Sequence, residues 1–371
     1  MKTEKAVFAA RSSRAVALLR HSELGAVAFV PGANLTYLTG VHLHLMERPT
    51  LFVLTQGADT YAVIPALEHQ KWSTAMPDAE TFYWDDAEGP QRAFRQLAQA
   101  LGSQTLLGVE GLRMRAAEYI SLAQHWPDEN LRDADSILTE LRMLKDAEEI
   151  AELRKAISIS EAALGEVFEA GLEGRTERSL VADLKIAMLS HGADGFAFDP
   201  IVLTGDASAN PHGDPGDRKI EKGQPLLVDF GASYGDMNAD ITRTVFCDHV
   251  RDHHAEIFET VQRANEAGRD AVKTGNPVGA IDTAATAILN ASPFADMILH
   301  KTGHGLGREV HEAPQVMQNN QTLQQSGMVV TIEPGLYRPG DIGVRIEDDV
   351  LITDSGADSL TNFTRDLLVF A

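Results

Sequence analysis

Four short apolar segments in the second half of the sequence each carry an acidic residue. In the segment from Met328 to Glu333, successive side chains of a β-strand point to opposite faces, so Glu333 lies opposite the apolar Val330 and Ile332. The same alternation places Glu347 opposite its apolar neighbours, and it assigns Asp229 and Asp240 each to one face of a further segment. A group of inward-facing carboxylates is typical of a cation-binding site.

The electrostatic cost of these acids predicts a metal site. An isolated buried carboxylate costs on the order of several kcal/mol unless it is paired, protonated or bound to a cation. Arg345 alone cannot balance four acids, whereas two divalent ions supply four positive charges and favour oxygen ligands. His304 is the expected imidazole ligand, because its flanking glycines allow close approach. Taken singly, each acid would also fit a half-exposed sheet, and His304 would fit an ordinary hydrogen-bonded histidine.

The elements that must position these residues form an α+β region in the second part of the chain. Asp146 and Glu149 have the spacing of a capping box, which predicts the start of a long helix. Helical patterns cover residues 146–168, 176–190, 253–274 and 278–290, and strand-like segments cover residues 226–231, 240–246, 328–333 and 343–352.

The first part of the chain alternates short apolar strands with helices, which favours an α/β domain with a mixed sheet. The strands are expected at 26–30, 51–54, 61–64 and 106–109, and the helices at 6–23, 89–101 and 114–125. We therefore expect a domain at residues 1–130, a linker at 131–145 and a second domain at 146–371.

Composition excludes several classes of protein. A chain of 371 residues with 44% hydrophobic residues can build packed cores, and its net charge of -22 argues against binding to nucleic acid or anionic membranes. The single cysteine, Cys247, cannot form an intramolecular disulfide. The N-terminus shows no secretory signal, and no apolar segment approaches the roughly 18 residues of a membrane span. We expect a soluble, cytoplasmic protein.

Several motifs follow one another in the order of a known family. They are Asp229-Phe-Gly231, Asp240-Ile-Thr-Arg-Thr244, His304-Gly-Leu-Gly307, His311-Glu-Ala-Pro314, Ile332-Glu-Pro-Gly335 and Arg345-Ile-Glu-Asp348. This set resembles the motifs of the pita-bread metallopeptidases, family M24, which include methionine aminopeptidase, aminopeptidase P, prolidase and the metal-free creatinases. The segments 34–40, 47–49 and 141–150 are similar to the creatinase-type N-terminal domain and linker helix of the prolidase and aminopeptidase P branch.

The resemblance implies a creatinase-like mixed-sheet domain followed by a pita-bread catalytic domain with a dinuclear metal centre. Its ligands would be Asp229, Asp240, His304, Glu333 and Glu347. Asp240 and Glu347 would bridge two divalent ions, of Mn²⁺, Co²⁺ or Zn²⁺. A hydroxide held between the metals would attack the scissile carbonyl, and Glu333 would pass a proton to the leaving nitrogen.

Three further residues match catalytic positions of the family. The resemblance implies that His212 contacts the substrate and helps to stabilise the intermediate, and that His311 contacts the carbonyl oxygen or the oxyanion. Arg345 would hold the bridging acids in place through charge-assisted hydrogen bonds.

The resemblance to a creatinase-type N-terminal domain, together with the ligand set that the metal-free creatinases lack, points to an exopeptidase that cleaves before proline. The expected substrates are proline-containing dipeptides, for a prolidase (Xaa-Pro dipeptidase), or short peptides, for an aminopeptidase P. A dipeptidase must bind the proline carboxylate with a fixed cation, and prolidases often carry Arg after the HExP motif, where this chain has Gln315. Arg338, Arg308 or Arg48 could replace that cation. Prolidase is the favoured interpretation.

A third hypothesis is a pita-bread scaffold that has become a binding module. The presence of all five ligands together with His212 and His311 favours an enzyme over this alternative. The resemblance also implies a homodimer.

Overall fold

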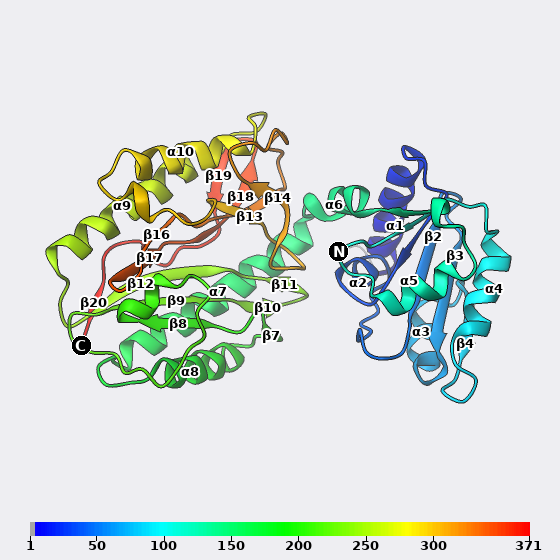
Figure 1. Ribbon diagram of the computed structural model, residues 1–371, viewed down its shortest axis with the longest axis horizontal. Helices are drawn as coiled ribbons and strands as arrows, with labels where there is room; N and C mark the ends of the chain where they lie inside the picture. Colours follow the sequence, from blue (N-terminus) through cyan, green and yellow to red (C-terminus); the bar gives the residue numbers. More distant parts are fainter. Residues whose placement is uncertain (1–3) are drawn as a thin grey trace. The chain divides into compact units, whose positions relative to one another are not determined.

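A computed structural model describes residues 4–371, and the chain divides into two units, residues 1–142 and 143–371 (Figure 1). The first unit is built on a six-stranded mixed sheet with the strand order β4-β3-β2-β1-β5-β6. Its strands are β1 Ala26–Phe29, β2 Leu51–Thr55, β3 Thr60–Pro65, β4 Glu80–Trp84, β5 Leu107–Val109 and β6 Leu131–Asp133. Its helices are α1 Glu4–Arg20, α2 Ala33–Thr39, α3 His69–Ala75, α4 Gln91–Leu101, α5 Ala116–Ala123 and α6 Asp135–Met143, which crosses the boundary between the units.

Both faces of this sheet are buried, which explains why its central strands are apolar throughout. Val27 and Phe29 of β1 pack into one core with residues of α1, α2 and α6, whereas Ala26 and Ala28 pack into another core with residues of α4. The predicted α/β domain with a mixed sheet is confirmed. Residues 131–145, expected to link the domains, contain β6 and α6.

The second unit contains four helices and four sheets. The helices are α7 Ala147–Glu169, α8 Glu177–Ser190, α9 Asp252–Asp270 and α10 Gly279–Asn290. A four-stranded sheet, in the order β20-β12-β9-β8, contains β8 Ile201–Thr204, β9 Pro225–Phe230, β12 Ile241–Cys247 and β20 Val369–Phe370. A five-stranded sheet, in the order β14-β13-β15-β18-β19, contains β13 Gly303–Gly305, β14 Glu312–Val316, β15 Val329–Ile332, β18 Asp348–Thr353 and β19 Gly356–Ser359. The two smaller sheets contain β7 Gly195–Phe196, β10 Ala232–Tyr234 and β11 Met237–Asn238, and β16 Gly335–Arg338 with β17 Ile342–Arg345.

Two helical layers cover these strands, with α7 and α8 on one side and α9 and α10 on the other (Figure 1). Leu226, Val228 and Phe230 of β9 share a core with residues of α7 and α8. Val344 and Ile346 share another core with residues of α9 and α10. The helices therefore bury the apolar faces of the strands, and the opposite faces carry the acids. The capping box of Asp146 and Glu149 is confirmed at the start of α7.

The predicted strand over residues 343–352 is wrong as a single element. It is divided into β17, which pairs with β16, and β18, which pairs with β15. The break occurs because the Glu347 backbone bonds to β12: its N–H donates to the carbonyl oxygen of Thr242 (3.1 Å), and its carbonyl accepts from the Arg243 guanidinium (2.6 Å). Glu347 therefore lies between β17 and β18 and belongs to neither strand.

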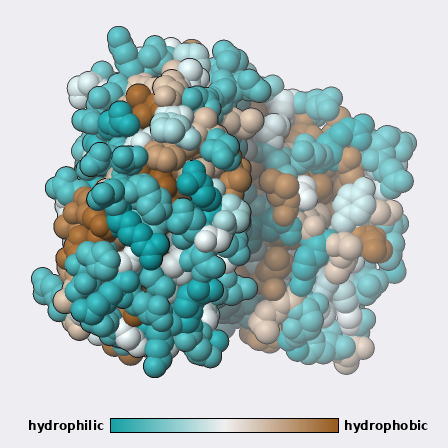
Figure 2. All heavy atoms as spheres, turned by 60° about the vertical axis from the view of Figure 1, so that its left-hand side comes forward, coloured by the Kyte–Doolittle hydropathy of each residue, from teal (hydrophilic) through white to brown (hydrophobic). Residues whose placement is uncertain are grey.

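The outer surface is mainly hydrophilic on the face drawn in Figure 2, with small hydrophobic patches between the polar side chains. Among residues 4–371, no helix combines the length and the apolar character that crossing a membrane requires.

Candidate metal centre

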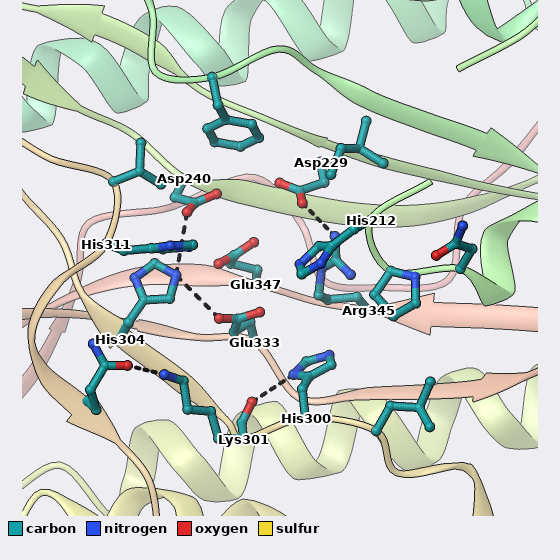
Figure 3. A pocket seen from close by; sticks show the side chains of 17 residues that line it. His212, Asp229, Asp240, His300, Lys301, His304, His311, Glu333, Arg345 and Glu347 are labelled. Carbon is teal, nitrogen blue, oxygen red and sulfur yellow. Dashed lines mark hydrogen bonds and ion pairs between the residues drawn. The ribbon is translucent and has the colours of Figure 1, made fainter. Parts of the chain in front are cut away.

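One cavity of about 810 Å³ in the second unit collects the predicted site residues (Figure 3). All five expected metal ligands line it, together with His212, His311 and Arg345. The other lining residues are Phe198, Ile201, Asn210, Pro211, Leu299, His300, Lys301, Val310 and Gln315. The side chains come from β8, β9, β13, β14 and β17, from residues next to the ends of β12, β15 and β18, and from loops.

Asp229 is positioned by the register between β9 and β12. It lies opposite Thr242, and Leu227 lies opposite Thr244, in an antiparallel pair. This register places Asp229 and Thr242 on the face directed away from the core of α7 and α8. The sequence prediction that Asp229 leaves the apolar face is therefore confirmed.

The other three carboxylates lie just beyond the ends of strands. Asp240 directly precedes β12, and its N–H donates to the buried Asp349 side chain (3.1 Å). Glu333 directly follows β15, and its N–H donates to the carbonyl oxygen of Thr302 (2.7 Å). Together with the anchored backbone of Glu347, these bonds fix all three residues at the backbone.

His304 lies on β13, where two glycines allow three strands to approach closely. A Cβ atom at Gly303 would lie 2.1 Å from the carbonyl oxygen of Thr331, and one at Gly305 would lie 2.1 Å from that of Ala313. Only glycine fits at these positions without separating the strands. The expectation that glycines serve close approach is confirmed for the backbone.

The orientation of the His304 ring is set by its own backbone. Its Nδ1 lies 3.0 Å from the carbonyl oxygen of Gly305, which can only accept, so Nδ1 carries the proton. Nε2 then presents its lone pair to Glu333 Oε1 at 3.4 Å and to Asp240 Oδ2 at 3.7 Å. Burial lowers the pKa of His304 to about 3, which keeps this ring neutral. A lone pair directed at two carboxyl groups is favourable when a proton or a cation lies between them, and a metal ion can fill that role.

The acids themselves resist ionisation in this environment. Burial, reinforced by the charges of Glu347 and Asp229, raises the pKa of Asp240 well above its usual range. Burial, reinforced by Glu333 and Asp229, raises the pKa of Glu347 in the same direction. Burial also raises the pKa of Glu333 to about 7, against the opposing charge of Arg345. Bound cations would reverse these shifts, because they favour the charged form of every carboxylate.

The donor set fits divalent metal ions. Asp240, His304 and Glu347 each offer a ligand atom, and these atoms all lie within 4.8 Å of one another. Asp229 Oδ1 is buried and has no hydrogen-bond partner among the described residues. A buried carboxylate oxygen of this kind is costly unless it binds a cation. Four carboxylates and one neutral imidazole are the hard and intermediate ligands that Mn²⁺, Co²⁺ and Zn²⁺ accept.

Arg345 donates three separate hydrogen bonds around the site, one of them to a carboxylate. Its guanidinium donates to Asp229 Oδ2 (2.5 Å), to Thr242 Oγ1 (3.0 Å) and to the Tyr337 hydroxyl (2.8 Å). Thr242 links Arg345 to Glu347, because its hydroxyl accepts from Arg345 and donates to Glu347 Oε2 at 2.6 Å. Arg345 thus supports two of the predicted ligands, one directly and one through Thr242.

The two additional histidines lie on the walls of the same cavity. The His311 ring meets the edge of the His304 ring, with centroids 4.2 Å apart, and burial lowers the pKa of His311. His212 is exposed in the loop before β9 and lines the cavity near Arg345 and Asp229 (Figure 3). Both side chains therefore face the space that a substrate would fill.

Sequence reasoning missed four polar residues of this site: Thr242, Tyr337, His300 and Lys301. His300 Nδ1 lies 2.7 Å from the carbonyl oxygen of Lys301, so Nε2 accepts from the Tyr337 hydroxyl at 2.8 Å. Burial lowers the pKa of His300 to about 4 and raises that of Tyr337 to about 12, which keeps both groups neutral. The adjacent pair His300-Lys301, four and three residues before His304, was the available signal.

The arginines considered for substrate binding lie elsewhere. Arg338 lies outside the cavity on the β16–β17 hairpin, with Nη1 3.8 Å from Asp341 Oδ2. Arg308 is buried and pairs with Glu149 and Asp236, each at 3.0 Å. Arg48 belongs to the first unit, where it pairs with Asp86 (2.7 Å).

Comparison with protein families gives two matches that together span most of the chain. The family model described as metallopeptidase family M24 matches residues 151–354, and that of the creatinase/prolidase N-terminal domain matches residues 11–144. The metallopeptidase match contains all five predicted ligands with His212, His311 and Arg345.

Individual relatives cover nearly the same length. An Xaa-Pro dipeptidase from Pyrococcus furiosus is 34% identical over 322 residues, which are 85% of this chain and 88% of the relative. The solved structure of dipeptidase PepE from Mycobacterium ulcerans is 33% identical, with a TM-score of 0.93 and coverage of 100% of both chains. A prolidase from Thermococcus sibiricus is 31% identical, with a TM-score of 0.93 and coverage of 98% of this chain and 99% of the other.

Proposed function

Because this chain belongs to metallopeptidase family M24 and carries a creatinase/prolidase N-terminal domain, we propose that it is a metal-dependent Xaa-Pro dipeptidase. The observation that carries the proposal is the convergence of Asp229, Asp240, His304, Glu333 and Glu347 in one cavity. Relatives named Xaa-Pro dipeptidase, dipeptidase and prolidase support the choice of substrate.

We propose that these five residues hold two divalent ions, of Mn²⁺, Co²⁺ or Zn²⁺. Asp229, Asp240, Glu333 and Glu347 would hold the ions through carboxylate oxygens, and His304 would hold them through Nε2. Bound ions of this kind supply an activated water and a Lewis acid that polarises the scissile carbonyl. The cellular supply of metal, rather than the ligand set, would decide which of these ions is bound.

Glu333 is the residue best placed to move a proton. Its carboxylate lines the cavity, with Oε1 3.4 Å from His304 Nε2, and a carboxylate there can accept a proton and release it within one catalytic cycle. In the proposed reaction, Glu333 takes a proton from the attacking water and delivers it to the leaving proline nitrogen.

His311 and His212 would hold the substrate close to Glu333. Their rings line the cavity from two chain segments, the residue before β14 and the loop before β9, and can donate hydrogen bonds to the peptide carbonyl as charge develops on its oxygen. Phe198, Ile201 and Leu299 give the same cavity an apolar wall that suits a proline ring. Arg345 acts through Asp229 and Thr242 and keeps the ligands in position.

The alternative of an Xaa-Pro aminopeptidase acting on longer peptides is not favoured by the names of these relatives. The presence of all five metal-ligand candidates favours an enzyme over a non-catalytic binding module.

Hydrolysis of Ala-Pro and Ala-Pro-Ala tests the proposal directly. Chelator-treated protein supplied with Mn²⁺, Co²⁺ or Zn²⁺ should release alanine from Ala-Pro and should act poorly on the tripeptide. Efficient release of alanine from Ala-Pro-Ala would identify an aminopeptidase instead. If neither peptide is cleaved with any of the three metals, the enzyme assignment is wrong.

We further propose a cytoplasmic homodimer, on the resemblance to the family. Analytical ultracentrifugation of the purified protein would test the dimer, and fractionation of cells would test the location.

A further inference from the structure

Two long cationic side chains of the described residues line the cavity, Arg345 and Lys301, and they differ in their hydrogen-bond partners. Arg345 is buried and donates hydrogen bonds to Asp229, Thr242 and Tyr337. Its guanidinium is thus held by the network of residues around the ligands. Lys301 is exposed and lines the cavity beside His300 (Figure 3).

Lys301 is held by a neutral partner. Its ammonium donates a hydrogen bond to Gln315 Oε1, at the position that follows the His311-Glu-Ala-Pro segment. Gln315 Nε2 in turn donates to the carbonyl oxygen of Glu312 (3.3 Å), which fixes the amide so that its oxygen faces Lys301. An ammonium group has three donors, and an amide oxygen neutralises none of its charge. Lys301 therefore lines the cavity without a carboxylate partner among the ion pairs of the described residues.

The charge of Lys301 reaches the reacting groups. After burial, the Lys301 ammonium is the next cause that lowers the pKa of His311, and it also opposes the rise in the pKa of Glu333. An exposed cation in the same cavity as the ligands suits the far end of a small substrate. In a dipeptide, the group at that end is the C-terminal carboxylate.

We infer that Lys301, oriented by Gln315, binds the C-terminal carboxylate of the dipeptide and thereby selects dipeptides over longer peptides. This inference rests on the proposed Xaa-Pro dipeptidase function and assigns its substrate recognition to two residues of this chain. A charge-assisted bond from the ammonium to the carboxylate is stronger than its bond to the Gln315 amide, so the substrate competes successfully for the lysine. In a longer peptide the same position holds a neutral amide, and the preference is lost.

The other basic residues considered for this role are already engaged outside the cavity. Arg308 is buried against Glu149 and Asp236, and Arg338 lies on the β16–β17 hairpin beside Asp341. Lys301 is the cation that shares the cavity with the predicted ligands and has no carboxylate partner among the ion pairs of the described residues.

The test compares Ala-Pro with Ala-Pro-amide, which differ only in the charge of the C-terminus. For the metal-loaded wild-type protein, kcat/KM should favour Ala-Pro by about 10- to 100-fold, the range expected for one hydrogen bond between charged groups. In Lys301→Met this ratio should fall at least tenfold, mainly through a higher KM for Ala-Pro. Lys301→Arg should restore most of the ratio, because it returns a cation to the same place.

Two further variants separate this role from a general effect on the protein. Gln315→Glu places a carboxylate against Lys301 and should also lower the ratio, although the lysine is still present. Lys155→Met removes an exposed lysine from α7 and should leave the ratio at the wild-type value.

Distinct results would overturn the inference. A wild-type ratio near one would show that the carboxylate is not recognised, while Xaa-Pro cleavage itself would stand. An unchanged ratio in Lys301→Met, or equal losses on both substrates, would assign Lys301 to another role. If metal-loaded wild-type protein cleaves neither substrate, the proposed function fails and this assignment fails with it.

Discussion

Replacement of Thr242 by valine isolates the hydroxyl that connects Arg345 to the metal ligands. Valine has nearly the same shape, but it cannot accept the 3.0 Å bond from Arg345 Nε or donate the 2.6 Å bond to Glu347 Oε2. Each bond involves a charged group, and such bonds contribute about 1.5–3 kcal/mol each. Because both partners are buried and Arg345 keeps its other two bonds, we expect the free energy of unfolding to fall by about 2–4 kcal/mol.

The metal site should be affected as well, because Glu347 loses the bond that orients it. Loss of a partner behind a metal ligand typically costs 10- to 100-fold in affinity, so Thr242→Val should weaken metal binding by about that factor. Isothermal titration of chelator-treated protein measures the affinity, and thermal unfolding measures stability.

The control is Thr204→Val, which removes an equally buried hydroxyl that donates to the carbonyl oxygen of Pro225 (2.9 Å) outside the cavity. It should lower stability without changing metal affinity. Wild-type metal affinity in Thr242→Val would refute the role assigned to this hydroxyl.

Two further predictions concern protons and packing. Metal affinity should rise with pH through neutral pH, because Glu333, with its pKa raised to about 7, must lose its proton to bind metal, as must Asp240, whose pKa is also raised. Titrations between pH 5.5 and 8 that show constant affinity would contradict this. Gly305→Ala should lower the free energy of unfolding by about 2 kcal/mol or more and abolish activity, because the new Cβ would lie 2.1 Å from the carbonyl oxygen of Ala313. The matched change Gly165→Ala, in the interior of α7 with nothing within 4 Å, should stabilise the protein by about 0.4–1 kcal/mol in chemical denaturation.

Strand alternation was sufficient to predict which acids leave the apolar faces. Asp229 and Glu333 lie where the period of two places them, because the opposite faces pack against helices. The pattern failed at Glu347, where the apolar residues on either side suggested one strand. The break depends on bonds from Thr242 and Arg243, which are distant in sequence and leave no local signal.

The hydrogen bonds that hold the site residues in place could not be predicted from local sequence patterns either. Tyr337 and His300 read as ordinary residues in the sequence, and only tertiary packing brings their side chains together at 2.8 Å and joins them to Arg345. Similarly, Lys301 and Gln315 are 14 residues apart and meet because β13 pairs with β14. Sequence reasoning correctly noted that Gln315 stands where an arginine was expected, but the partner that makes this substitution meaningful required the fold.

The most direct test of the central claim is the rate of Ala-Pro hydrolysis as Mn²⁺ is added stepwise to chelator-treated protein. If the five cavity residues form a dinuclear catalytic centre, the rate should start near zero, rise with added metal and level off at about two equivalents per chain, as expected for a two-metal site. Full hydrolysis before any metal is added, or no hydrolysis at saturating metal, would contradict the account.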